Sequence, residues 1–214
     1  MNERLIIFTR YPEPGKAKTR LIPALGAEAA ADTHRLMTEH TLAQVKPLLR
    51  SRSLMVEVWF EGGDRDQMEA WLGDGLRYQS QPEGDLGDRM LQAFQSALKN
   101  GVNAAVIIGT DCPELTDALL AEAFQALQQT DVVLGPAADG GYYLIGLRQV
   151  IPDLFQAITW STDRVLQQTV AIVEKLNLSL TLLPMLTDVD RPEDLPVWER
   201  VKDARPADGK GLDS

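Results

Sequence analysis

The sequence predicts a single α/β domain whose sheet is mixed but mainly parallel and is flanked by helices. Short apolar runs alternate with longer segments of helical periodicity, a pattern typical of βαβ units. The run at 104–108 is continuously apolar, as expected for a strand buried on both faces. With 214 residues and 44% hydrophobic residues, the chain can build one large core, and no Pro-, Gly- or Ser-rich linker divides it.

Strands and helices alternate through the first half of the chain. We expect strands at 5–9, 54–60 and 76–79. A long helix is expected at 28–49, and Asp64 caps a short helix after the second strand. From Leu86 onward, apolar residues recur every four positions, which indicates one buried face of a further helix.

The second half continues the alternation. We expect strands at 104–108, 132–134, 142–147 and 178–183, and helices that begin near Thr116, Thr162 and Glu193. The predicted domain spans residues 1–202. Residues 203–214 are rich in Gly, Pro and Asp and are expected to form a flexible C-terminal tail.

Composition excludes several classes of protein. With 31 acidic and 21 basic residues the net charge is −10, which argues against a protein that coats nucleic acid or anionic membrane. One cysteine excludes a disulfide scaffold and multi-thiolate metal sites. The two histidines, His34 and His40, lie six apart and are expected to be packing or surface residues. No run approaches a membrane span of ~18 residues and no signal peptide is evident, so we expect a cytoplasmic protein.

A basic loop follows the first strand. Four basic residues fall within eleven positions of this acidic chain, and two prolines and a glycine restrict the loop: Arg10, Gly15, Lys16, Lys18 and Arg20 are the candidates for phosphate binding. Cations held at a strand end suit a di- or triphosphate. The loop is not a Walker A motif, and a solvated charged loop is the alternative.

Asp111 follows the apolar strand at 104–108. A carboxylate at the end of a central strand is a good ligand for Mg²⁺, which takes one or two carboxylates together with phosphate oxygens. The alternative is a helix cap, but Thr116 already supplies that signal. Cys112 has no evident histidine partner and is expected to be a small buried residue.

Two further carboxylates follow the last predicted strand. Asp188 and Asp190 alternate, so in extended backbone they point to the same side. We expect one of them to reach a metal and the other to cap the helix that Pro192 opens.

Three more turns hold candidate residues. The segment from Asp139 to Tyr143, with Gly140, Gly141 and Tyr142, is either a plain hairpin turn or the wall of a pocket for a sugar or base. Asp85 and Asp88 lie at a helix entry that could hold a nucleoside. Trp160 and Ser161 lie at another helix entry, where ordinary capping competes with a role beside an acceptor.

Four blocks in order resemble one family. They are 8–21 (FTRYPEPGKAKTRL), 109–113 (GTDCP), 139–143 (DGGYY) and 188–190 (DVD), and together they are similar to the rSAM/selenodomain-associated transferases. That group belongs to the nucleotide-diphospho-sugar transferases of GT-A fold. It is related to 2-phospholactate and molybdenum cofactor guanylyltransferases. The resemblance covers the chain to about Arg200.

The resemblance implies a metal-dependent transferase. It places the phosphates on the basic loop and Mg²⁺ or Mn²⁺ on Asp111, with Asp190 as the best match for a late carboxylate ligand. Pro113 replaces the second aspartate of the usual Asp-x-Asp motif. Asp139 is the candidate for contacting or deprotonating a small-molecule acceptor. Transfer of a sugar from a nucleotide-sugar is expected, with two alternatives: nucleotidyl transfer from a nucleoside triphosphate, or a catalytically silent nucleotide-binding protein. No oligomeric state is predicted.

Overall fold

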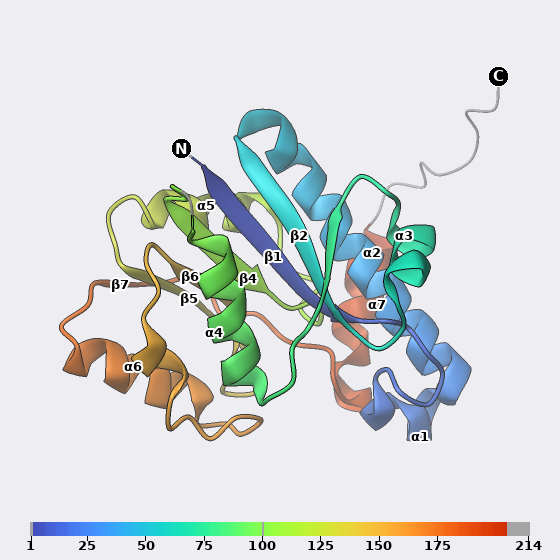
Figure 1. Cartoon of the computed structure of the whole chain (residues 1–214). Coiled ribbons are helices and arrows are strands. Elements are labelled where there is room, and N and C mark those ends of the chain that lie inside the picture. The colour runs from blue at the N-terminus through green and yellow to red at the C-terminus, as the bar shows by residue number, and fades with distance from the viewer. Residues whose placement is uncertain (1, 100, 205–214) are drawn as a thin grey trace.

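The computed structural model describes residues 2–99 and 101–204, which form a seven-stranded sheet between two layers of helices (Figure 1). The order across the sheet is β3-β2-β1-β4-β6-β5-β7. The strands are β1 (Glu3–Arg10), β2 (Leu54–Glu61), β3 (Arg77–Ser80), β4 (Ala104–Ile108), β5 (Val132–Pro136), β6 (Tyr142–Leu147) and β7 (Leu180–Leu182). The predicted fold class is confirmed.

Strand direction places the loops that carry the candidate site. Each neighbouring pair is parallel except for those of β6, which runs antiparallel to β4 and β5. Ile7 of β1 lies opposite Ile108 of β4, so these central strands end side by side. The loop at 10–20 and the turn at 109–113 therefore leave the same edge of the sheet.

Two apolar clusters join the sheet to its helices. On one face, β1, β2 and β4 pack against α2 (Ala27–Ser51), α3 (Arg65–Leu72) and α5 (Asp117–Ala126). On the other, they and β5 and β6 pack against α4 (Leu86–Ala97), α6 (Val165–Lys175) and the 3₁₀ turn η2 (Pro152–Phe155). Figure 1 shows α4 in front of the sheet and α2 behind it. Strands buried on both faces need continuous apolar runs, as β4 has.

The predicted capping residues are confirmed for two helices. Asp64 accepts a hydrogen bond from the amide of Gln67 in a capping box, and Thr116 accepts one from the amide of Leu119. The helix expected from Thr162 begins only at Val165 and has no side-chain cap. The last strand is shorter than expected, because only Leu180–Leu182 pair with β5.

A third, small apolar cluster lies beside the sheet edge that carries the loops. Met37 of α2, Val189 and Trp198 of α7 (Leu195–Asp203) are its buried members. The short helix α1 (Ile22–Leu25) follows the 3₁₀ turn η1 (Thr19–Leu21), and η3 (Pro192–Asp194) leads into α7. Most of the predicted tail, 205–214, lies outside the described residues. No helix in the described ranges has the length and hydropathy of a membrane span.

Candidate functional site

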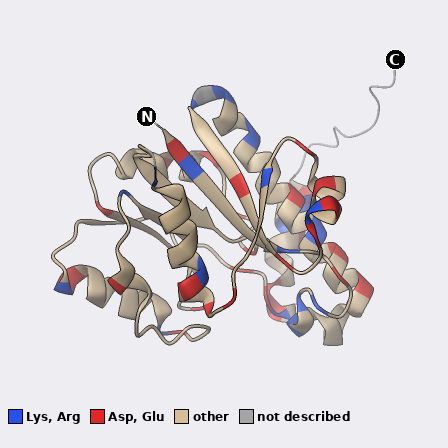
Figure 2. Cartoon of the chain, viewed as in Figure 1, with Lys and Arg blue, Asp and Glu red and all other residues tan. Residues whose placement is uncertain are grey.

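Two adjoining cavities open at the carboxyl ends of the central strands. The smaller has a volume of 470 Å³ and is lined by the basic loop, and the larger has a volume of 900 Å³. Five residues line both: Arg20, Leu86, Gly109, Asp111 and Asp190. The position agrees with the general placement of ligands in open α/β sheets. Figure 2 shows acidic and basic residues close together along the chain around the segment between β1 and α1.

The basic loop is held by its own side chains. Arg10 and Glu61 are register partners on β1 and β2, and their side chains form an ion pair of 2.8 Å. Arg10 also donates to the carbonyl of Lys16 at 2.7 Å. The Lys16 ammonium pairs with Glu13 at 3.0 Å and is largely exposed. Arg10, Lys16, Lys18 and Arg20 all line the smaller cavity, whereas Gly15 does not.

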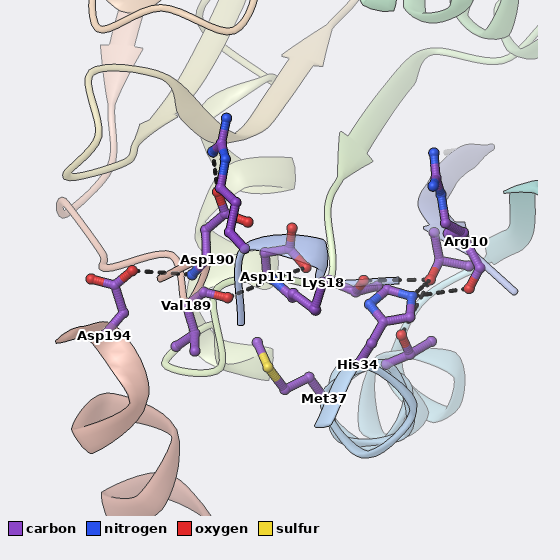
Figure 3. Close-up of polar contacts among 12 residues, drawn as sticks. Arg10, Lys18, His34, Met37, Asp111, Val189, Asp190 and Asp194 are labelled. Atoms are coloured by element: carbon purple, nitrogen blue, oxygen red, sulfur yellow. Dashed lines mark hydrogen bonds and ion pairs between the residues drawn. The ribbon is translucent and has the colours of Figure 1, made fainter. Parts of the chain in front are cut away.

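Lys18 connects three segments of the chain. Its buried ammonium pairs with the Asp111 carboxylate at 2.8 Å and donates to the Val189 carbonyl at 2.5 Å, so it points between these two groups in Figure 3. The Lys18 backbone is left-handed, with φ of 48°. Burial raises the pKa of Asp111, but the Lys18 ammonium and nearby His34 outweigh burial, and the pKa is lowered. Asp111 is therefore a carboxylate with a cation already beside it.

Asp190 carries a second ion pair of the same kind. Its carboxylate pairs with Arg20, from the same loop as Lys18. The amides of Asp190 and Arg191 both donate to Asp194. The prediction that Asp188 or Asp190 caps the helix opened by Pro192 is therefore wrong. Asp194 caps it from inside the first turn, which leaves both earlier carboxylates at the larger cavity.

Val189 explains why Asp188 and Asp190 face the cavity together. Its side chain is fully buried in the cluster with Met37 and Trp198. In extended backbone, successive residues point to opposite sides, so burying Val189 turns its two neighbours outward. The Val189 amide also donates to the Asp111 carbonyl at 2.8 Å, which joins this segment to the β4 turn.

His34 lies beneath the basic loop and is buried. Of the two roles expected for it, packing or surface, the packing role is the one the structure shows. Its Nε2 is 2.9 Å from the Arg10 carbonyl and 3.3 Å from the Thr9 hydroxyl. Thr9 in turn contacts Thr110 at 3.4 Å, so this network joins the ends of β1 and β4. Burial lowers the pKa of His34, although Asp111 and the Arg10 carbonyl oppose that shift. His40 is also buried.

The larger cavity is bounded by the β5–β6 hairpin and by the segment at 160–163. Asp139 accepts a hydrogen bond from the Gly141 amide at 2.8 Å and is exposed. The lining residues that had been predicted for an acceptor pocket are Asp139, Gly141, Tyr142, Trp160 and Ser161. Gly140 is absent from the lining, since it packs against the backbone of Asp163, where a Cβ would lie 2.2 Å from the carbonyl oxygen.

Asp188 is the carboxylate whose environment sequence reasoning missed. It is half-buried in the larger cavity. Burial raises its pKa, and the nearby charges of Asp139 and Asp111 add to the increase. The same carboxylates and burial raise the pKa of the Cys112 thiol, which is buried as predicted. The DVD pattern indicated that Asp188 faces the site, but only the fold shows its proximity to Asp139.

Asp85 and Asp88 form a reciprocal capping box at the start of α4. Neither lines either of the two cavities described above, and both side chains bond backbone amides, so this placement does not support nucleotide contact. Instead, the wall of the smaller cavity beside α4 is formed by residues that sequence reasoning did not single out: Phe8, Glu61, Gln81 and Arg89. Their only signal was position, at or just beyond a strand end or one turn into a helix.

The donor set at the junction of the cavities fits a hard divalent cation that arrives with phosphate. Among the described residues, no three His, Cys, Asp or Glu side chains converge into a ready-made metal site. However, Asp111 and Asp190 both line the junction, and Mg²⁺ is commonly held by one or two carboxylates with phosphate oxygens completing its shell.

Family comparison matches residues 44–162, more than half of the chain, to a family described as "Uncharacterized protein conserved in bacteria (DUF2064)". The chain belongs to this family. A solved structure from Desulfovibrio desulfuricans G20, provisionally named a nucleotide-diphospho-sugar transferase, is 35% identical. Its TM-score is 0.87, with 95% of this chain and 88% of that chain covered. No curated protein matches the chain.

More distant structures share the fold of this DUF2064 member. Inositol-1-phosphate CTP transferase from T. maritima has a TM-score of 0.60 at 12% identity, covering 97% of this chain and 98% of that chain. Glucosyl-3-phosphoglycerate synthase from Mycobacterium tuberculosis, solved with Mn²⁺, UDP and its product, has a TM-score of 0.57 at 12% identity, covering 99% and 83%. The predicted nucleotide-diphospho-sugar transferase fold is confirmed, and the link to radical-SAM proteins stays a prediction.

Proposed function

We propose that this protein is a divalent-metal-dependent transferase that moves a glycosyl group from a nucleotide-diphospho-sugar to a small acceptor. The observation that carries the proposal is the meeting of two cavities at Asp111 and Asp190, with a basic loop in one and Asp139 in the other. A donor and an acceptor need two adjoining compartments with charge-stabilising groups between them. The name given to the 35% identical Desulfovibrio protein supports the same activity.

The roles of the residues follow from their places. Arg10, Lys16, Lys18 and Arg20 would bind the diphosphate and stabilise the charge that develops on it as the glycosyl bond breaks. Asp111 and Asp190 would hold Mg²⁺ or Mn²⁺, which supplies Lewis-acid stabilisation of the leaving diphosphate when bound.

The acceptor side has its own candidate base. Asp139 is exposed in the larger cavity and would contact or deprotonate the acceptor hydroxyl, beside the ring of Tyr142 and near Trp160. Its Oδ1 accepts from the Gly141 amide, which orients the carboxylate at the cavity. This arrangement separates the group that handles the acceptor proton from the groups that handle phosphate charge.

Nucleotidyl transfer is the second candidate, because four cations of the basic loop line the smaller cavity and a triphosphate could use the same loop. The inositol-1-phosphate CTP transferase from T. maritima has a name that belongs to this class. The two reactions differ in what leaves, since a sugar transferase releases a nucleoside diphosphate and a nucleotidyltransferase releases pyrophosphate. A catalytically silent binding protein would release neither.

The test is a panel of nucleotide-sugars and nucleoside triphosphates with Mg²⁺ or Mn²⁺ and mixed small acceptors, scored for diphosphate and pyrophosphate. We expect nucleoside diphosphate from one nucleotide-sugar, and loss of that turnover in a folded Asp111→Asn variant. Pyrophosphate release from a triphosphate alone would replace this proposal with nucleotidyl transfer. Full activity in the folded variant would remove Asp111 from the mechanism.

A further inference from the structure

Four charged side chains at or beside the junction of the two cavities form two ion pairs before any ligand binds. Lys18 pairs with Asp111, and Arg20 pairs with Asp190. Each pair joins a cation assigned to phosphate with a carboxylate assigned to metal, and both carboxylates line the junction of the two cavities. Lys16 and Arg10, by contrast, pair with Glu13 and Glu61, neither of which lines both cavities.

These pairings restrict what can bind alone. A divalent cation needs carboxylate oxygens, but Lys18 and Arg20 each hold one oxygen of Asp111 and Asp190, and both repel a second positive charge. A phosphate needs the two cations, but Asp111 and Asp190 hold them and repel its negative charge. When metal and diphosphate arrive together, all four side chains exchange partners. Asp111 and Asp190 then face the metal and Lys18 and Arg20 face the phosphates, so that each side chain again has a partner of opposite charge.

We propose that this site selects a metal–diphosphate complex by exchanging two internal ion pairs, so that cation and nucleoside diphosphate bind with strong positive coupling. The inference rests on the proposed function and adds that the metal and the diphosphate bind as one complex.

Arg20 and Asp190 are the better pair to test, because their side chains are 58% and 30% exposed, whereas that of Lys18 is 3% exposed. Arg20→Gln leaves Asp190 available, so it should tighten the binding of Mn²⁺ alone. Asp190→Asn leaves Arg20 available, so it should tighten the binding of UDP, GDP, CDP or ADP in the presence of EDTA. Both effects run opposite to the simple loss of a ligand-binding residue.

Charge-matched controls separate pair exchange from general electrostatics. Lys16→Gln removes the same charge from the same loop, where Lys16 pairs with Glu13 instead of a cavity carboxylate. Glu193→Gln removes one negative charge from the lining of the larger cavity, three positions after Asp190. Lys16→Gln should change the affinity for Mn²⁺ alone by no more than about twofold, the scale of a screened exposed charge. Glu193→Gln should change the affinity for nucleotide in EDTA by no more than the same factor.

The measurements are Mn²⁺ binding by electron paramagnetic resonance of the free ion and nucleotide binding by calorimetry. For the wild-type protein, each nucleoside diphosphate that binds should tighten Mn²⁺ by about tenfold or more, and Mn²⁺ should tighten that nucleotide by the same factor. Arg20→Gln should tighten Mn²⁺ alone by about threefold or more and lower the coupling. Circular dichroism establishes that each variant is folded.

Three outcomes overturn the inference. Mn²⁺ that binds equally tightly with and without nucleotide refutes the coupling, while the proposed function stands. Arg20→Gln and Lys16→Gln that change Mn²⁺ affinity equally refute the exchange and leave a general charge effect. If no nucleoside diphosphate binds, with or without Mn²⁺, the proposed function fails and this inference with it.

Discussion

Replacing Lys18 by Met should destabilise the protein even when no ligand is present. Methionine keeps most of the length of the lysine side chain but cannot donate a hydrogen bond to Asp111 or to the Val189 carbonyl. The buried carbonyl loses its donor, which costs about 1–3 kcal/mol. Asp111 adds about 0–1 kcal/mol, because its side chain is 48% exposed and water replaces much of the lost ion pair. Together we expect the free energy of unfolding to fall by about 2 kcal/mol.

A double-mutant cycle isolates the ion pair from the carbonyl contact. Lys18→Met, Asp111→Asn and the double variant are unfolded in urea at pH 7, with Lys16→Met and Asp111→Asn as the control cycle. We expect a coupling of about 1 kcal/mol between Lys18 and Asp111, and less than about 0.4 kcal/mol in the control. Equal coupling in both cycles would refute the reasoning, since Lys16 pairs with Glu13.

The pH dependence has a definite sign. The pKa of Asp111 is lowered from 3.8 in the folded protein, so its ion pair contributes stability above the unfolded value. That contribution is lost as the pH falls through the lowered folded pKa. The stability difference between the wild-type protein and Lys18→Met should therefore be constant from pH 7 to about pH 5 and shrink below about pH 4. A difference that grows on acidification would contradict the assigned pair.

Strong local patterns allowed most of the fold to be predicted. The limits of β4 and β6 agree with the sequence-based expectations because the apolar run of β4 ends at Gly109 and that of β6 begins directly after Gly141. The start of α6 could not be predicted, because the segment from Ser161, which has a φ of 62°, to Arg164 forms turns and the helix begins only at Val165. Backbone left-handedness in a non-glycine residue leaves no sequence pattern.

The candidate site was predicted in its parts but not in its pairings. Sequence order placed Asp111 and the basic loop at neighbouring strand ends, because parallel strands share an edge. It could not show that Lys18 reaches Asp111 or that Arg20 reaches Asp190, because the partners of each pair are far apart in the sequence. Arg20 and Asp190, for example, are separated by 170 positions. The helix entry at Asp85 was expected to hold a nucleoside, but the structure shows a capping box there.

Three further predictions follow from packing and capping. Val189→Ala removes two buried methyl groups and leaves a cavity, so the free energy of unfolding measured in urea should fall by about 2 kcal/mol. The same variant should weaken Mn²⁺ binding in the presence of nucleotide, as measured by paramagnetic resonance. Asp85→Ala should cost about 1 kcal/mol in urea unfolding, while a tenfold loss of nucleotide affinity would instead restore its predicted ligand contact. Gly87→Ala places a Cβ 2.6 Å from Trp160 Nε1, so thermal unfolding should shift downward and tryptophan fluorescence should change; an unchanged protein would mean that the ring moves freely.

The C-terminal helix gives this acidic protein a way to maintain a cation-binding loop and a carboxylate segment in contact. The cluster of Met37, Val189 and Trp198 fixes the segment at 188–190 from below. Lys18 fixes it from above through the Val189 carbonyl, as Figure 3 shows. Because Val189 is held on both sides, exchange of the ion pairs of Asp111 and Asp190 requires movement of side chains alone. In a site built in this way, the charged side chains can exchange their internal partners for the groups of a ligand while the backbone that positions them stays in place.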